Sequence, residues 1–398
     1  MTVQENWKRI VYLMCAIQIG SGIAMIGVLA FLPLYLGELG IHDSGEAAFW
    51  AGLISGVTPF MIAFSAPFWS VQSAKRGPKT VMTIVLVTVM LTVFLCGVAT
   101  APWQILVLRI FQGLFGGFVP IGLSVVTMVT PEEETSRMLG YFQAALVMGI
   151  MFGPLLGGLV ADTFGYRMPF LFFGVLSVLC LIGTRLYMPD IRIKTEEKKE
   201  SAWKELKYFA GIPLIRIMII LQFLCNFGIT GIGPVLPLYI RDMIGGNSDM
   251  IATIVGIIIF LAGGVSALCS LSVGNVTAHV PMKKLLIGSI FFAGFTFIMQ
   301  YLMPNIWGLG FFRAATGFGM GFIMPIANTY IAQSVPADKR SIVFGVVSGV
   351  SLIGNVAGPV CSGFLAMALG FASVFWLTAF AFFAAGASVW LHLRTHPA

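Results

Sequence analysis

The stretch RIFQGLFGGF at residues 109–118 has a counterpart, RAATGFGMGF, at residues 313–322. The two lie 204 residues apart, and both begin with arginine and end with phenylalanine. LPLYLGELG at 32–40 and LPLYIRDMIG at 236–245 are separated by the same 204 residues. The sequence therefore predicts two halves of the same architecture.

The composition indicates that the solvent around most of the chain is a lipid bilayer. Hydrophobic residues make up 58% of the 398, only 10% are charged, and the mean hydropathy is +0.95. Apolar runs of about 20 residues, the length that crosses a bilayer as a helix, recur throughout. They do not alternate as barrel strands do. We predict an all-α polytopic membrane protein with twelve spans, at about 10–36, 48–71, 80–100, 103–128, 138–160, 168–188, 213–240, 250–273, 285–303, 306–332, 342–367 and 373–392.

The basic residues predict the orientation, because lysine and arginine concentrate in cytoplasmic loops. With the N-terminus inside the cell, 19 of the 23 lysines and arginines face the cytoplasm. Both termini are then cytoplasmic, and the net charge of +7 reflects topology and not nucleic-acid binding.

The domain organisation follows from the repeat and from one long charged segment. We expect six-helix bundles at 1–188 and 213–398, joined by a cytoplasmic linker at 189–212. Repeats in the same orientation imply a pseudo-twofold axis along the membrane normal, with a central site between the halves. The six cysteines all lie in spans and are expected to be buried free thiols, without metal or cofactor.

A glycine pattern marks the fifth span, and GIMFGPLLGG at 149–158 is repeated as GNVAGPVCSG at 354–363. Glycines four apart form a flat stripe that lets another helix approach closely, so simple helix packing is one interpretation. The full pattern comprises Gly140, Gly149, Gly153, Pro154, Gly157 and Gly158. It resembles the motif of the antiporter branches of the major facilitator superfamily. The resemblance covers essentially the whole chain, and it implies that superfamily's two-bundle fold and an export function.

Arg109 is the second signal, because it lies inside the fourth span, about 9 Å from its end. A charge at that depth should face a cavity or a partner, although a purely structural arginine is the alternative. LRIFQG, with Arg109, Gln112 and Gly113, resembles the fourth-span motif of the drug:proton antiporters. That resemblance implies a role for Arg109 in proton coupling. Arg313 is its counterpart, with Thr316 in place of the glutamine.

The sequence offers no carboxylate for a proton path in mid-span. Glu38, Asp162 and Asp242 come nearest, and we expect each to be solvated at an outer helix end. A neutral, zwitterionic or anionic amphipathic substrate therefore fits better than an obligate dication. Proton coupling is implied by the resemblance alone.

The predicted substrate cavity is lined by spans 1, 4, 7 and 10, which line it in this superfamily. Interhelical hydrogen bonding explains the polar members of the set equally well, and lipid-facing packing explains the aromatic ones. The candidates are Gln18, Ser21, Phe31, Tyr35, Gln112, Phe115, Gln222, Asn226, Phe227, Arg313 and Asn328. Gln18 and Gln222 occupy equivalent repeat positions and are expected to form a pair facing the axis.

The loop between spans 2 and 3 resembles the superfamily's signature loop. It keeps Lys75, Gly77 and Lys79, with Arg76 beside them, but has Ala74 where the family has an acid. That acid helps to latch the cytoplasmic helix ends. We expect the cations either to meet the glutamates at 132–134 or to leave the outward-facing latch weak.

These features together predict a secondary transporter and not an enzyme, since there is no catalytic motif or nucleotide-binding loop. The resemblance implies a monomeric multidrug exporter of the bacterial inner membrane, driven by protons. The alternative functions are a dedicated exporter of one metabolite, such as a siderophore, and a proton-independent facilitator. A membrane enzyme or a receptor is a more remote alternative.

Overall fold

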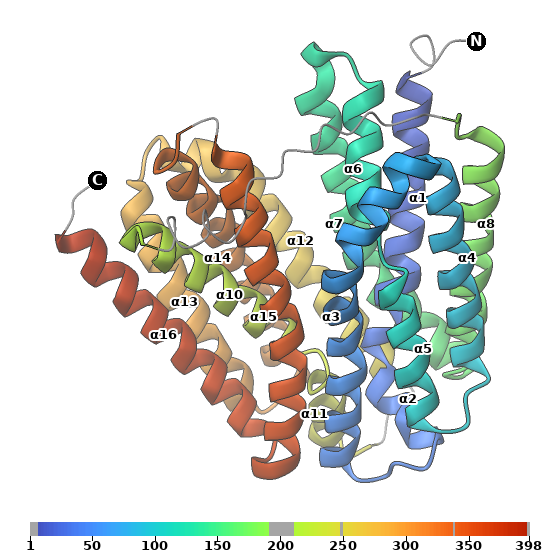
Figure 1. Ribbon diagram of the computed structural model, residues 1–398. Coiled ribbons are helices and arrows are strands. Elements are labelled where there is room, and N and C mark those ends of the chain that lie inside the picture. Colours follow the sequence, from blue (N-terminus) through green and yellow to red (C-terminus); the bar gives the residue numbers. More distant parts are fainter. Residues whose placement is uncertain (1–6, 191–210, 247–249, 337–338, 396–398) are drawn as a thin grey trace. The chain divides into compact units, whose positions relative to one another are not determined.

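A computed structural model describes residues 7–190, 211–246, 250–336 and 339–395 (Figure 1). The regular elements in these ranges are all helices. Twelve of them, or pairs of them in series, are long and apolar enough to cross a membrane. This confirms the predicted all-α polytopic membrane fold.

The chain forms two compact units. The described residues of Met1–His42, Val57–Glu197 and Asp249–Ile257 make up the first, and those of Asp43–Gly56, Lys198–Ser248 and Ile258–Ala398 the second. Two long helices, α3 (Ser44–Arg76) and α12 (Ile251–Thr277), contribute residues to both units. The linker predicted at 189–212 falls on 191–210, which lie outside the described residues.

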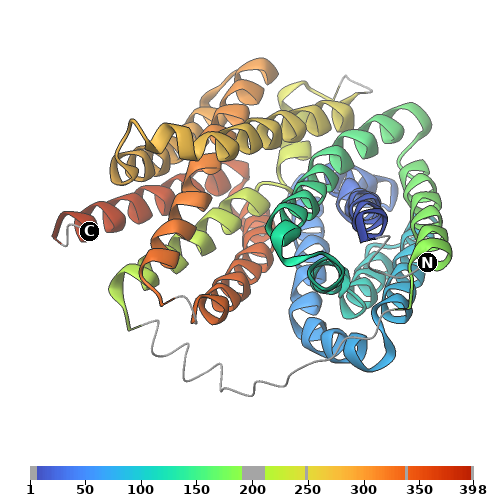
Figure 2. The ribbon, with the colours of Figure 1, turned by 90° about the horizontal axis from the view of Figure 1, so that it is seen from above.

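The first unit is built around α1, which packs against α6, α7 and α8, while α4 packs against α5 and α8 (Figure 2). Prolines lie in the first turns of α4, α5 and α8. Proline suits this position because the amide hydrogen that it lacks would have no partner within the helix. The helices wholly in this unit are α1 (Trp7–Ile26), the 3₁₀ turn η1 (Gly27–Ala30), α2 (Leu32–Glu38), α4 (Pro78–Gly97), α5 (Pro102–Leu114), α6 (Phe118–Val129), α7 (Glu132–Phe164) and α8 (Met168–Tyr187).

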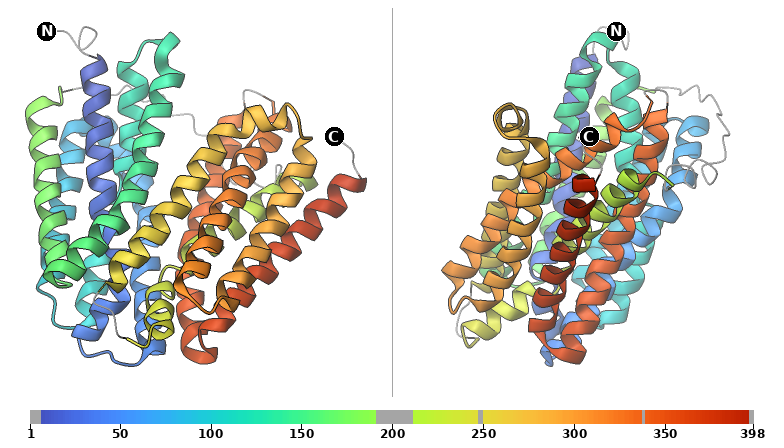
Figure 3. Two further views of the ribbon diagram at one scale, coloured as in Figure 1. Left: turned by 180° about the vertical axis from the view of Figure 1, so that it is seen from behind. Right: turned by 90° about the vertical axis from the view of Figure 1, so that its left-hand side faces the viewer.

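The second unit repeats this plan. Its α10 packs against α14, α15 and α16, and α13 packs against α14 and α16 (Figure 3). The close pairs α1–α7 and α10–α15 join equivalent members of the sequence repeat. The helices wholly in this unit are α10 (Pro213–Gly231), α11 (Leu236–Met243), α13 (Met282–Leu302), α14 (Ile306–Gln333), α15 (Arg340–Leu369) and α16 (Phe371–Thr395).

The surfaces of both units carry large apolar side chains, as expected where lipid and not water is the neighbour. Leu271 and Trp307 are 84% and 88% exposed. The cysteine prediction is only partly correct. Cys96, Cys180 and Cys225 are buried, but Cys361 lies on the exposed face of α15.

Candidate functional site

The first membrane helix of each unit is interrupted. In the first unit α1 ends at Ile26, η1 follows, and α2 begins at Leu32. In the second unit α10 ends at Gly231 and α11 begins at Leu236. Each break leaves helix carbonyls without their usual amide partners, and in a bilayer such groups must find others.

Arg109 of α5 supplies one of these partners. Its Nη1 donates to the carbonyl oxygen of Met25, at 3.1 Å, and to Oε1 of Gln112, at 2.8 Å. Met25 is the last residue but one of α1, so the guanidinium lies at the negative end of that helix dipole. Arg109 is only 4% exposed, and its Nε has no hydrogen-bond partner among the described residues.

Arg313 of α14 occupies the same place in the second unit. Its Nη2 donates to the carbonyl oxygen of Ile229, close to the end of α10, at 3.4 Å. Both donor and acceptor are offset by 204 from Arg109 and Met25. Each arginine therefore binds the end of the interrupted first helix of its own half.

The two arginines differ in their second partner. Thr316, which replaces the glutamine, pairs with the hydroxyl of Thr296 at 2.9 Å and accepts from Nε2 of Gln300 at 2.8 Å. Gln300, on α13, is fully buried. Gln300 was not among the candidates predicted from the sequence, although an amide in an otherwise apolar run is a signal of a buried polar contact.

In the first unit, Gln18 and Ser21 are buried on α1. The Ser21 hydroxyl donates to the carbonyl of Gln18 at 3.3 Å, and Oε1 of Gln18 has no partner among the described residues. A cavity of about 80 Å³ lies beside Ser21. Its walls are apolar, and they include Ser21, Met25, Val85, Val89, Gly116 and Phe118.

In the second unit, Gln222 and Asn328 join α10 to α14 by a hydrogen bond of 2.5 Å. Nδ2 of Asn226 donates to the carbonyl of Gln222 at 2.9 Å. These contacts fit the interhelical alternative for the amides. Gln18 and Gln222 belong to different units, and their pairing stays a prediction.

The aromatic candidates divide into two groups. Phe31 and Tyr35 are fully buried inside the first unit, where Phe31 packs against Phe170 and the Tyr35 hydroxyl donates to the carbonyl of Cys96. Placing these two in a cavity wall was wrong, because they fill the core around α2.

The other two aromatic candidates, Phe115 and Phe227, are half-buried. Phe115 packs against Trp69, and Phe227 against Phe223. Their side chains are therefore accessible in part.

The glycine pattern of α7 makes close helix contacts. A Cβ on Gly149 would lie 3.0 Å from the Cα of Gly22, and one on Gly153 would lie 3.0 Å from the amide nitrogen of Gly27. Gly157 faces the carbonyl of Gly27 as well. These glycines thus let α7 pack closely against α1 and η1. Gly140 takes no part in this contact, since a Cβ there would meet nothing within 4 Å.

A second face of α7 contacts the beginning of α12. Gly158 lies against the carbonyl of Ala252, and a Cβ on Gly256 would come within 2.5 Å of the Pro154 carbonyl. The carboxylate of Asp162 accepts from the amides of Thr253, at 2.6 Å, and Ala252, at 3.3 Å. Asp162 is half-buried and caps the N-terminus of α12, and its solvation stays a prediction.

The basic loop lies between α3 and α4. Lys75 and Arg76 end α3, Lys79 lies in the first turn of α4, and Gly77 between them has a φ of 86° that favours glycine.

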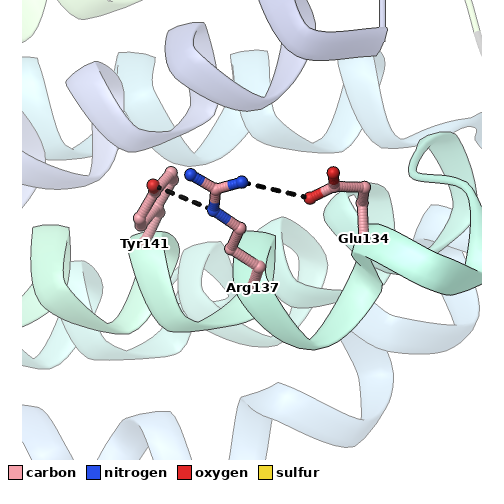
Figure 4. A network of polar contacts seen from close by, with 3 residues as sticks. All are labelled: Glu134, Arg137 and Tyr141. Atoms are coloured by element: carbon pink, nitrogen blue, oxygen red, sulfur yellow. Dashed lines mark hydrogen bonds and ion pairs between the residues drawn. The ribbon is translucent and has the colours of Figure 1, made fainter.

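The glutamates at 132–134 do not meet these cations. Glu134 instead pairs with Arg137 at 3.8 Å, and Nε of Arg137 donates to the Tyr141 hydroxyl at 3.1 Å (Figure 4). Within the described residues no ion pair joins the loop to these glutamates, so that expectation was wrong. The weak latch stays a prediction.

These features define a helical membrane protein with two repeated halves, each containing an interrupted first helix whose end is bound by a buried arginine. The family model of the Major Facilitator Superfamily matches residues 14–299 and 218–398. The chain therefore belongs to the Major Facilitator Superfamily and is a transporter, not an enzyme.

Relatives with full-length similarity include multidrug transporters. The chain is 29% identical to "Multidrug resistance protein MdtG" of Proteus mirabilis, over 98% of this chain and 97% of the relative. It is 30% identical to the "Uncharacterized MFS-type transporter YuxJ" of Bacillus subtilis, over 92% and 93%.

Solved structures show the same fold. A bacterial homologue of the human lysosomal transporter Spinster superposes with a TM-score of 0.83 at 15% identity, over 99% of this chain and 98% of that one. A mutant of the nucleoside transporter NupG gives a TM-score of 0.73 at 13% identity, over 95% and 98%.

Proposed function

We propose that this transporter exports small amphipathic compounds, as a multidrug-type efflux protein. The observation that carries the proposal is the full-length similarity to proteins named for multidrug resistance, at 29% and 28% identity. The complete glycine pattern of α7 supports it, because that pattern resembles the motif of the exporting branches.

Alternating access is the proposed mechanism, with 1–188 and 213–398 moving as two bundles about a central site and 189–212 linking them. Both termini would face the cytoplasm of a bacterial cell, and the transporter would work as a monomer in the inner membrane. The excess of basic residues in the predicted cytoplasmic loops supports this orientation.

Proton antiport is the proposed drive, with Arg109 in the coupling path. Arg109 and Gln112 are buried and hydrogen-bonded to each other, so a change in the position of one side chain alters the hydrogen bond of the other. The fourth-span resemblance supports this role.

The substrate class follows from the polar groups available. Hydrogen-bonding amides are available at Gln18, Gln222, Asn226 and Asn328. Apolar surface is available at Phe115, at Phe227 and in the cavity of the first unit. No carboxylate lies in mid-span in the sequence. Neutral, zwitterionic or anionic amphipathic compounds therefore fit better than dications.

A proton-independent facilitator is the second candidate, and the same lack of a mid-span acid favours it. A protonatable carboxylate can change its charge near the working pH, whereas an arginine stays charged.

The test is transport in vesicles that contain the purified protein, with a panel of structurally unrelated dyes and an imposed pH gradient. We expect uptake of several dyes into inside-out vesicles that are acidic inside, and loss of uptake when an ionophore collapses the gradient. Transport that persists without the gradient would assign the protein to the facilitators. Transport of one compound alone would indicate a dedicated exporter.

The variant for this assay is Arg109→Ala, with Arg137→Ala as the matched control that removes an exposed positive charge. We expect dye transport to fall at least tenfold in the first and to be unchanged in the second, at equal protein content. Unaltered transport and pH dependence in Arg109→Ala would remove Arg109 from the coupling path.

A further inference from the structure

The pair Arg109 and Gln112 has hydrogen-bonding capacity that the described residues do not use. Nε of Arg109 and Nε2 of Gln112 are both buried donors without a partner there. Arg109 is 4% exposed and Gln112 is 1% exposed. Buried donors are normally satisfied, so these two, on one hydrogen-bonded pair, can each take a further acceptor.

The charge of Arg109 is also incompletely balanced. In the part of the chain that the structure describes, Arg109 forms no ion pair with a carboxylate. The end of α1, through the Met25 carbonyl, provides about half a negative charge. Water would satisfy the free donors but would leave the remaining charge, and an unbalanced charge inside a membrane protein is costly.

The cavity of the first unit, which Met25 but neither Arg109 nor Gln112 lines, is suited to an apolar group. Met25 contributes to both features, because its carbonyl accepts from Arg109 and the residue also lines the cavity. Gly116, another lining residue, lies four positions after Gln112 along the chain. The cavity of about 80 Å³ has apolar walls, so it suits a short hydrocarbon part and not a second charge.

We infer that Arg109 and Gln112 bind one negative charge, carried either by chloride or by the carboxylate of an amphipathic substrate whose apolar part occupies this cavity. An anion neutralises the guanidinium and accepts from the unused donors in a charge-assisted bond. The carboxylate source rests on the proposed export function, whereas the chloride source does not.

The second unit provides an internal comparison. Arg313 also has an unpartnered Nε, but the residue three positions on is Thr316, whose hydroxyl is engaged by Thr296 and Gln300. The amide donor of the first unit is therefore absent there. This difference is why we assign the anion to Arg109 and not to its counterpart.

The test is ligand-dependent unfolding of the full-length purified protein in detergent at constant ionic strength. Chloride is titrated against isethionate, a larger sulfonate, and hexanoate is compared with hexanamide, which has the same length and no charge. We expect chloride and hexanoate to raise the unfolding temperature in a saturable way and to compete with each other. Hexanamide should have no comparable effect.

Variants separate the anion site from general salt effects. Gln112→Leu should weaken anion binding roughly tenfold by removing a buried donor. Arg109→Gln should abolish anion binding. Arg109→Lys keeps the positive charge but loses the planar set of guanidinium donors, so it should weaken anion binding without abolishing it. Arg137→Gln removes one exposed positive charge and should leave binding as in the unaltered protein.

The outcomes are distinguishable. Binding of chloride alone assigns the site to an inorganic anion, and stronger binding of hexanoate assigns it to a substrate carboxylate. Equal effects of hexanamide and hexanoate, or anion effects that survive in Arg109→Gln, would overturn the inference. Dye transport without anion binding would contradict the anion site but support the proposed export function. Anion binding without dye transport would contradict the export function but support the anion site.

Discussion

At the scale of single residues, the ends of helices explain the charged groups inside this protein. Arg109 and Arg313 bind carbonyls at the C-terminal ends of α1 and α10, and Asp162 binds amides at the N-terminal end of α12. Each charge lies at the helix end of opposite polarity. Broken or beginning helices therefore supply partial charges that offset part, but not all, of the charge on these side chains.

Asp162 gives a prediction at this scale. Asp162→Asn removes the charge that faces the α12 amides and should lower stability by about 1 kcal/mol, the usual contribution of a helix cap. The measurement is the unfolding temperature in detergent. Asp190→Asn, the same change at an exposed carboxylate, is the control. Equal effects of the two changes would show that the cap contributes nothing.

At the scale of elements, the contact between α7 and α1 depends on the absence of side chains. Gly149 and Gly153 bring α7 close to α1 and η1, and the atoms opposite them are backbone atoms, of Gly22 and Gly27 among others. Backbone atoms cannot move aside as the end of a flexible side chain can, so even one methyl group must separate the helices.

The prediction compares two glycines of the same helix and the same motif. Gly153→Ala should destabilise the protein by about 1–3 kcal/mol through overpacking and reduce dye transport. Gly140→Ala faces open space and should be neutral or gain up to about 1 kcal/mol in helix propensity. Unfolding temperature and transport are measured for both. If Gly153→Ala behaves like Gly140→Ala, the glycine stripe is not needed for packing.

At the scale of the whole molecule, the proposed orientation makes a direct prediction. A green fluorescent protein fused after Ala398 should fluoresce, because it folds in the cytoplasm but not after export through the general secretory path. Alkaline phosphatase fused after His42 should be active, because it requires the outer side. The opposite pair of results would reverse the orientation inferred from the basic residues.

The sequence alone determined the class, the number of spans and the repeat. A span in a bilayer is a long apolar stretch whose backbone groups are mostly satisfied within its own helix, so hydropathy shows it in the sequence directly. The 204-residue offset is likewise visible in the sequence alone. Twelve spans were predicted, and the described residues contain twelve candidate spans.

Only the tertiary structure decided what the polar residues touch. Arg109 binds a carbonyl 84 residues away, Asp162 binds an amide 91 residues away, and Tyr35 turns into the core and not toward a cavity. Backbone carbonyls and amides carry no side-chain signature in a sequence. Helices that are apolar on all sides also do not reveal which face is buried, because lipid and protein interior favour the same residues.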